Sequence, residues 1–348
     1  MPTRLRTVPA LVAGVLLLAA CGSESASPGG DGGRARNGDG LVRAEALCPS
    51  DFVQYGDLPS AGSPSGGSRA SGTPTPLPLP SPDGTAEGDV KVTGLYAWGS
   101  DSGCGADFSA DFEVTNTSTE KADYTVTLGF FTAAGTIVDH VERTVASVGP
   151  GRTVKGTAGL GASLGDAADV ANVKVEKVRS VPADEASSAS GPCPASGVHV
   201  YADQGDAAMG LRVVGLHLVN CGTRPYSLNG YPELELLDEE HEAVDGVRIL
   251  HGTDQISTGT GGGGSPQPVL LQPGEAAQAG LAWRNTTNFG EPVHAPYVRV
   301  VAKPGARPVM VVPELDLGTT GKLGVGPWEK DEEFRGDGGA APRPTVAP

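Results

Sequence analysis

A serine between glycines is the first candidate for chemistry in this 348-residue chain. The segment GASLG, 161–165, matches the G-x-S-x-G pattern, in which a tight turn exposes the serine hydroxyl as a nucleophile. That chemistry requires a strand before Ser163, a helix after it, and an aspartate and a histidine farther along an α/β sheet. The flanking sequence has no such alternation of strands and helices. We therefore interpret Ser163 as a loop serine and predict no catalytic residue.

A histidine among carboxylates is the second candidate. The segment DEEHE, 238–242, surrounds His241 with acidic side chains, and Asp245 and His251 follow it. Such groups bind copper or zinc. The segment directly follows two leucines and precedes the turn sequence AVDG, so a solvated hairpin loop is the favoured interpretation. We predict no metal and no cofactor. The region from Asp238 to His251, together with Ser163, is kept as the site of an alternative function, a metal-handling surface protein or a hydrolase.

Two further histidines and a glycine-rich run have structural interpretations. His199 and His217 lie in strand-like alternation, which predicts surface or edge positions. In the run 259–264 only Thr260 has a side chain. A phosphate-binding loop would open a helix, whereas SPQP follows this run, so nucleotide binding is not expected. Ordering six such residues costs backbone entropy with little apolar burial in return. We therefore predict a disordered loop there, whose deletion changes stability by less than about 1 kcal/mol.

Cys21 stands at the end of an apolar run, 8–20, that follows Arg4 and Arg6. The run is too short for a bilayer-spanning helix and lacks a basic stop-transfer flank, which is typical of an export signal. The residues LAAC, 18–21, resemble the lipobox of bacterial lipoproteins, where the cysteine thiol accepts diacylglycerol and the chain is cleaved before it. Two acyl chains suffice for stable anchoring. We predict that residues 1–20 are a signal peptide and that Cys21 is lipidated.

Four cysteines remain after Cys21. An even number in an exported chain favours disulfides, and four cysteines permit three pairings. Proximity within one domain favours Cys193 with Cys221, which leaves Cys48 with Cys104. No CxxC spacing occurs, so a zinc or redox site is not expected.

The composition limits the partners of the exported chain. Removing residues 1–20 deletes two arginines and no acid, which changes the formal charge from −16 to −18. Nucleic acid and anionic lipid surfaces would repel such a chain. The 52 glycines and 29 prolines favour β-structure with many turns and disordered linkers.

Low-complexity segments divide the mature chain. We predict a flexible tether at 21–46, a disordered insertion at 60–87, a linker at 183–192 and a disordered tail at 329–348. Two folded domains, 47–182 and 193–328, remain between them.

Alternating hydrophobicity predicts strands in the first block. Apolar side chains at 108, 110, 112 and 114 alternate with polar ones, and the alternation resumes from 124 to 130 after the turn NTSTEKAD. This period places one row on a buried face and the other in water, as in antiparallel sandwiches. The second block repeats this pattern. In the first block a strand ends at Asn116 and in the second at Asn220, and each is followed by a polar turn, an apolar strand and a Pro-Gly turn. We predict two related β-sandwiches.

The second block resembles a known family. The order CPASGVHVY, LRVVGLHLVNCG, SLNGYPELELLD, VLLQPGEAAQAGLAW, YVRVVAKPG and LGVGPW, residues about 193–328, is similar to the actinobacterial lipoprotein domain called domain of unknown function 4232. The resemblance implies an immunoglobulin-like sandwich and a disulfide between Cys193 and Cys221. It implies no settled activity.

These observations predict an all-β protein of two tandem immunoglobulin-like sandwiches joined by disordered linkers. We expect a non-enzymatic binding protein, held on the extracytoplasmic face of the cell membrane by the lipid on Cys21. Its ligand would be another envelope molecule, a protein or a glycan, because sandwiches present long loops on a rigid scaffold. No nucleic-acid partner is expected.

Overall fold

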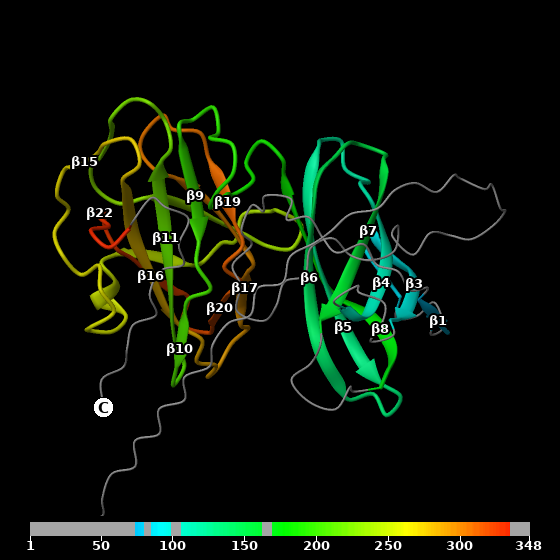
Figure 1. Cartoon of the computed structure of the whole chain (residues 1–348). Helices are drawn as coiled ribbons and strands as arrows, with labels where there is room; N and C mark the ends of the chain where they lie inside the picture. Colours follow the sequence, from blue (N-terminus) through cyan, green and yellow to red (C-terminus); the bar gives the residue numbers. More distant parts are fainter. Residues whose placement is uncertain (1–73, 80–84, 99–105, 162–168, 335–348) are drawn as a thin grey trace, which may run out of the picture. The chain divides into compact units, whose positions relative to one another are not determined.

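The computed structural model describes residues 74–79, 85–98, 106–161 and 169–334, and both folded parts consist of strands (Figure 1). In these ranges the helical structure is a single 3-10 turn, η3 (Thr253–Gln255). No helix in the described ranges is long and apolar enough to cross a bilayer. Cys21, Cys48, Cys104 and Ser163 lie outside the described residues. The predicted all-β class is confirmed.

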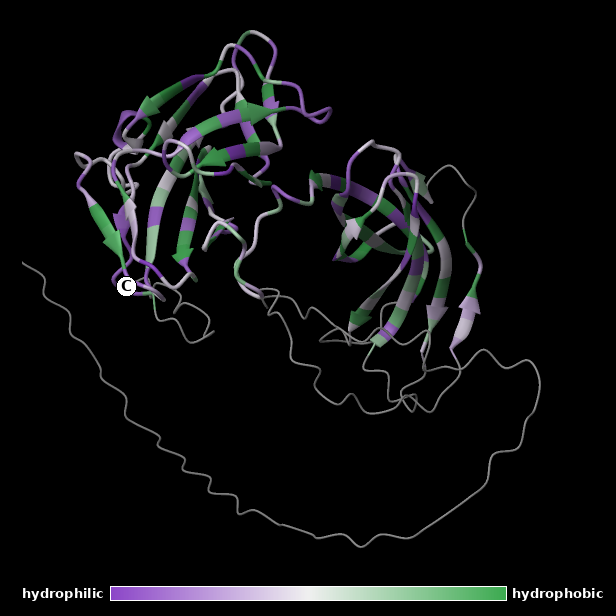
Figure 2. Ribbon diagram, turned by 90° about the horizontal axis from the view of Figure 1, so that it is seen from above, coloured by the Kyte–Doolittle hydropathy of each residue, from purple (hydrophilic) through white to green (hydrophobic). Residues whose placement is uncertain are grey.

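The first domain is a sandwich of two antiparallel sheets. One sheet has the order β1 (Thr75–Leu77), β3 (Val90–Ala97), β4 (Ala106–Thr115) and β7 (Thr153–Gly161), and β2 (Ala86–Glu87) also pairs with β3. The other has the order β6 (Ile137–Val148), β5 (Ala122–Thr132) and β8 (Val170–Pro182). The apolar residues of the predicted alternation form the core of this domain. Ala110, Phe112 and Val114 of β4 are buried together with Tyr124 and Val126 of β5. Figure 2 shows this alternation of hydrophobic and hydrophilic residues along the strands.

The predicted disordered insertion at 60–87 is too broad. Strands β1 and β2 lie within it, and β1 pairs antiparallel with β3 from Thr75 opposite Ala97 to Leu77 opposite Leu95. A proline has no backbone N–H to donate to a neighbouring strand. A proline-rich segment can still form an edge strand, because one side of an edge strand has no partner strand.

The second domain packs one large sheet against smaller ones. The large sheet has the order β10 (Asp206–Ala208), β11 (Leu211–Asn220), β16 (Ala276–Arg284), β21 (Lys322–Val325) and β14 (Arg248–His251), with β9 (Val198–Ala202) on β11 and β22 (Glu329–Lys330) on β16. The opposing sheet is β13 (Glu233–Leu237), β18 (Tyr297–Val301) and β19 (Val309–Val311). Two strand pairs complete the domain: β12 (Tyr226–Leu228) with β15 (Val269–Leu271), and β17 (Val293–Ala295) with β20 (Leu315–Gly318).

The core of the second domain contains two tryptophans, Trp283 and Trp328, which are 2% and 1% exposed. Trp98 of the first domain is also buried. The domain continues past residue 328, because Asp331 donates its N–H to Ala276 O. The first residues of the predicted disordered tail are therefore folded.

The linker 183–192 is packed on the second domain. Met310 of β19 donates its N–H to Glu185 O at 2.7 Å, and Ser188 donates its N–H to Val200 O of β9 at 3.1 Å. The Glu185 carboxylate also accepts from Arg299 Nε at 2.8 Å. Residues 185–188 thus bridge strands of two opposing sheets, and this part of the linker is a strap rather than a free spacer.

The glycine-rich run 259–264 is also built into the domain, contrary to the predicted disorder. Thr253, which is fully buried, donates its hydroxyl to Gly261 O and its N–H to Gly262 O. A Cβ at Gly262 would lie 3.0 Å from Gly326 Cα. The run therefore approaches the large sheet more closely than side chains would allow. These contacts with the sheet and with Thr253 hold the run in place, although its composition alone predicts disorder.

Candidate functional site

The acidic segment at 238–242 forms a self-contained turn. Asp238 Oδ1 accepts the N–H groups of Glu240 at 3.1 Å and Glu242 at 2.8 Å, and His241 has a positive φ of 65°. The His241 ring meets the Tyr297 ring edge-on, with centroids 4.4 Å apart. An aspartate that accepts two backbone N–H groups is an ordinary turn-forming residue. The segment thus adopts the predicted hairpin loop.

The second histidine of the alternative site has its own partner. His251 stacks on Tyr231, with ring centroids 4.1 Å apart and an interplanar angle of 9°. His241 and His251 thus contact different tyrosines, and the two imidazole rings do not form one site. In the ranges that the structure describes, no three His, Cys, Asp or Glu side chains are grouped to hold a metal ion.

His199 and His217 also make specific contacts on the large sheet. His217 Nε2 lies 3.1 Å from Asp203 Oδ2, and its ring stacks on Tyr201. His199 is on β9, which pairs with β11, yet it is only 5% exposed because the strap covers it. Ser188 Oγ lies 2.8 Å from His199 Nδ1. Burial lowers the pKa of His199.

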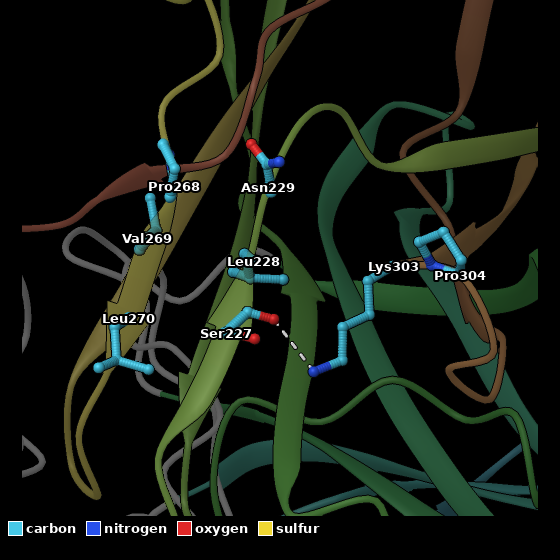
Figure 3. A pocket seen from close by; sticks show the side chains of 8 residues that line it. All are labelled: Ser227, Leu228, Asn229, Pro268, Val269, Leu270, Lys303 and Pro304. Carbon is cyan, nitrogen blue, oxygen red and sulfur yellow. Dashed lines mark hydrogen bonds between the residues drawn. The ribbon is translucent and has the colours of Figure 1, made fainter.

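A groove on the second domain is the best candidate for a site. It consists of two hollows, of about 410 and 250 Å³, which share Lys303 and Pro304, and we call it the Lys303 groove. The first hollow lies between the end of β12, the start of β15 and Lys303 (Figure 3). Its other lining residues are Ser227, Leu228, Asn229, Pro268, Val269 and Leu270. The second hollow lies among β9, β18 and β19, and its apolar lining includes Val198, Val200, Val300 and Val309.

Lys303 is held where the two hollows meet. Its Nζ lies 3.4 Å from the centroid of the Tyr226 ring and donates to Ser227 O at 3.0 Å. A cation over an aromatic face is attracted by the negative potential of the ring. Burial lowers the pKa of Lys303 and raises that of Tyr226. The ammonium group therefore has an oriented position but fewer water contacts than an ordinary surface lysine.

The turn after Lys303 adds a second cation to the groove. Pro304 and Gly305 form a turn closed by Ala306 N–H to Lys303 O at 2.9 Å, and the positive φ of Gly305, 77°, suits that position. Arg307 follows the turn and lines the second hollow. The ion pairs of the described part of this domain include Arg212, Arg299 and Lys330, but neither Lys303 nor Arg307. The groove therefore offers two cations that have no acidic partner among the described residues.

Segments that are far apart in sequence are hydrogen-bonded next to the groove, where Ala302 lines the second hollow and Asn229 the first. Trp328 donates its indole N–H to Ala302 O and its backbone N–H to Gly230 O, both at 2.9 Å. Gly230 belongs to the NGYP segment and Trp328 to the terminal Pro-Trp pair, so these two elements meet beside Lys303.

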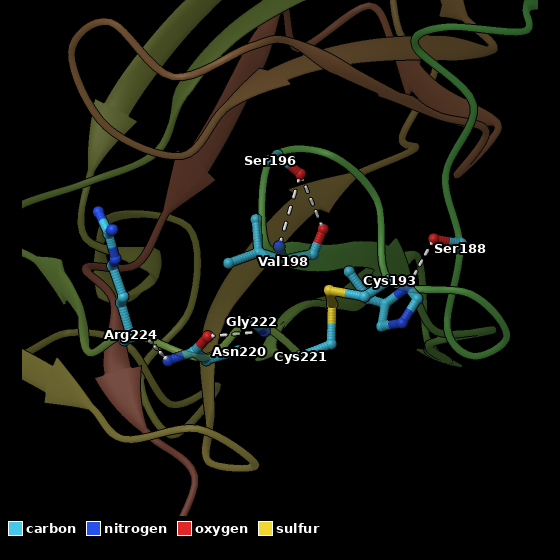
Figure 4. The surroundings of a disulfide bond; sticks show 9 residues. Ser188, Cys193, Ser196, Val198, Asn220, Cys221, Gly222 and Arg224 are labelled. Carbon is cyan, nitrogen blue, oxygen red and sulfur yellow. Dashed lines mark hydrogen bonds between the residues drawn. A yellow bond between two sulfur atoms is a disulfide. The ribbon is translucent and has the colours of Figure 1, made fainter.

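The disulfide lies beside the loop that leads into β9, one of the strands that line the second hollow (Figure 4). Cys193 and Cys221 are joined, with Cα atoms 5.6 Å apart, which confirms the predicted pair. Gly222, next to Cys221, donates its N–H to Gly197 O at 2.9 Å, and Ser196 Oγ donates to Val198 O at 3.1 Å. The bridge thus fixes the loop that leads into β9.

Apolar walls with two cations that lack an acidic partner among the described residues can bind an anionic group that has an apolar part beside it. Sequence reasoning did not single out Lys303 or Arg307. The segment KPGAR, 303–307, carries one available signal, since it presents two cations around a Pro-Gly turn in a chain with 41 acidic side chains.

The comparisons with known proteins agree with the resemblance in sequence. Residues 193–329 match the family described as domain of unknown function DUF4232. The second domain, with the Lys303 groove, is this matched segment. No curated protein matches the chain.

Proposed function

We propose that this protein, with its C-terminal DUF4232 domain, is a non-enzymatic binding protein anchored to the extracytoplasmic face of the cell membrane through lipid on Cys21. The anchor is inferred from the apolar run and the LAAC segment that ends in this cysteine. The Lys303 groove would hold the ligand, an envelope protein or glycan that presents an anionic group beside an apolar one.

The single observation behind the binding role is the pair of cations in an apolar groove. The chain has 25 basic and 41 acidic side chains, and other cations of the same domain, such as Arg299 and Lys330, form ion pairs. Lys303 and Arg307 line the groove without an acidic partner among the described residues. An anion that enters the groove gains a charge-assisted hydrogen bond from a donor that is already oriented.

The proposal is tested by titrating the envelope fraction that binds the wild-type protein against three variants. Lys303→Met keeps the aliphatic stem over Tyr226 and removes the charge, and Lys303→Glu reverses it. Lys322→Glu is the matched control, because Lys322 is an exposed lysine of the same domain outside the groove. We expect affinity to fall by about tenfold for Lys303→Met and further for Lys303→Glu, since hydrogen bonds to charged groups contribute about 1.5–3 kcal/mol. Equal binding by all variants would refute a ligand site at Lys303.

A further inference from the structure

Two apolar side chains project fully into solvent from the second domain. Met209 is 99% exposed and Phe289 is 100% exposed, and no other large apolar side chain in the described ranges exceeds 56%. Singly exposed apolar residues are normal on protein surfaces. Complete exposure of a phenylalanine and a methionine, however, leaves both without any packing contact that would explain their presence.

The backbone at Met209 is unfavourable for that residue. Met209 and Gly210 form the two-residue turn between β10 and β11, with Ala208 paired to Leu211, and their φ angles are 49° and 79°. Turns with two positive φ angles favour Asn-Gly or Asp-Gly. A methionine here adopts a left-handed conformation that costs free energy and gains no packing. The turn therefore presents an apolar side chain at a position where local stability favours a polar one.

The two residues belong to loops at the same end of the domain. Asn285, at the base of the loop that carries Phe289, donates its N–H to Gly210 O at 3.0 Å. The same loop is held on its other side, where Thr319 donates its N–H to Thr286 O at 3.1 Å. Figure 1 shows the β10–β11 end at the bottom of the domain. We call Met209 and Phe289, with these two loops, the apolar tip.

Charges near the apolar tip are of both signs. Asp206 and Arg212 flank Met209, and Arg284 and Glu291 flank Phe289. Arg212 is also paired with Asp316 at 3.3 Å. No single-sign field surrounds the tip among these described residues, so contact there would depend on apolar burial and only weakly on salt.

We infer that the apolar tip inserts into the interfacial region of a lipid bilayer. The inference goes beyond ligand binding in the Lys303 groove and rests on the proposed anchoring only for the presence of a membrane nearby. A bilayer accepts two projecting side chains without a complementary surface. A protein partner needs a well-packed pocket around each apolar anchor and a rim that excludes water. The tip offers protruding loops with threonine and asparagine beside Phe289, and a polar flank of this kind suits the hydrated headgroup layer.

The test uses residues 21–348 with Cys21→Ala, so that neither an acyl chain nor the apolar run 8–20 contributes, and phosphatidylcholine vesicles as the probe. In this background Phe289→Trp reports insertion, because Trp98, Trp283 and Trp328 are buried and provide a constant signal. We expect its emission to shift to the blue on adding vesicles and to be quenched by brominated lipid. The response should persist in high salt.

A pelleting experiment in the same Cys21→Ala background measures the energetic contribution. Met209→Asn with Phe289→Ser should lower the partition coefficient by about tenfold or more for each side chain, as expected from their apolar area. Met209→Asn restores the favoured turn residue, so unfolding is not the expected cause. Ile249→Ser is the matched control, because Ile249 is 39% exposed on β14, outside both the Lys303 groove and the apolar tip; it should pellet like the parent.

An unchanged emission of the Phe289→Trp variant at all lipid concentrations, or equal pelleting by all variants, would overturn the inference. Loss of a protein partner on Met209→Asn with Phe289→Ser, without any vesicle binding by the parent, would overturn it as well and assign the tip to that protein instead. Because Cys21 is absent throughout, failure here leaves the proposed anchor and groove to their own tests.

Discussion

Asn116 and Asn220 occupy the same corner in the two domains and make the same hydrogen bonds. Both are buried, at 0% and 1% exposure. The Asn116 amide donates to Glu120 O and Val148 O, both at 2.7 Å, and its oxygen accepts from Ser118 N–H. The Asn220 amide donates to Arg224 O at 2.9 Å, and its oxygen accepts from Gly222 N–H (Figure 4). The amide also donates to Leu271 O at 3.0 Å. The carbonyls of Val148 and Leu271 each stand just before an x-Pro-Gly turn.

These bonds predict the cost of losing the asparagine. Only a side-chain amide supplies two donors and an acceptor in this space. Asn220→Ala leaves the buried Leu271 carbonyl, the Arg224 carbonyl and the Gly222 N–H without that partner, so we expect a loss of about 2–4 kcal/mol in unfolding free energy, measured by urea denaturation. Asn229→Ala, at an exposed asparagine nearby, should change stability by less than about 0.5 kcal/mol. Similar values for both variants would contradict the corner's structural role.

The glycine-rich run gives a second prediction. Gly262→Ala adds a Cβ at a φ of 66° and 3.0 Å from Gly326 Cα, whereas Gly259→Ala meets the same conformational penalty at a φ of 84° in open space. We expect about 1 kcal/mol of destabilisation for Gly259→Ala and about 2–3 kcal/mol for Gly262→Ala, measured as shifts in urea midpoint. If the two substitutions cost the same, the close approach to the sheet is absent in solution.

His199 predicts a pH dependence of stability. Burial lowers its pKa in the folded state from the ordinary value of 6.5, so between the folded pKa and 6.5 the unfolded chain binds more protons. Stability from this residue is therefore present above about pH 6.5 and falls as the pH drops through that value toward the folded pKa. Urea midpoints of wild type and His199→Gln, compared from mildly alkaline to mildly acidic pH, should converge on the acidic side. A constant difference would exclude His199 as the titrating group.

The disulfide predicts a loss of stability on reduction. Cys193 and Cys221 are 28 residues apart, and loop-closure entropy then corresponds to about 3–4 kcal/mol. The double variant Cys193→Ser with Cys221→Ser should unfold at correspondingly lower urea concentration. Non-reducing peptide mapping checks the pairing itself, and recovery of either cysteine as a free thiol in the native protein would disprove it.

Lipidation of Cys21 is checked by metabolic labelling with a fatty acid. The wild-type chain should incorporate the label and lose residues 1–20, whereas Cys21→Ala should remain unlabelled and unprocessed because it lacks the thiol that accepts the lipid. An unlabelled wild-type chain would refute the anchor without bearing on the Lys303 groove.

Local patterns along the chain were enough to predict the class of fold and the corner at each asparagine. Strand alternation has a period of two, so the buried faces of strands such as 106–115 are readable from neighbouring residues alone. The pairing of Cys193 with Cys221 followed from proximity within one block, and the equivalence of Asn116 and Asn220 from two matching strand and turn patterns. Each of these features depends on the order of nearby residues.

The groove, the strap and the order of the glycine-rich run depend instead on contacts between distant segments. Lys303 gains its role from Tyr226 and Ser227, and His199 becomes buried because Ser188 crosses it. Gly262 is ordered by contact with Thr253 and Gly326, partners that no local pattern identifies. An argument from composition predicts disorder for such segments, because ordering them costs backbone entropy and their own side chains bury little apolar area. It cannot include the contacts that distant strands supply, since those exist only after the sheets have packed.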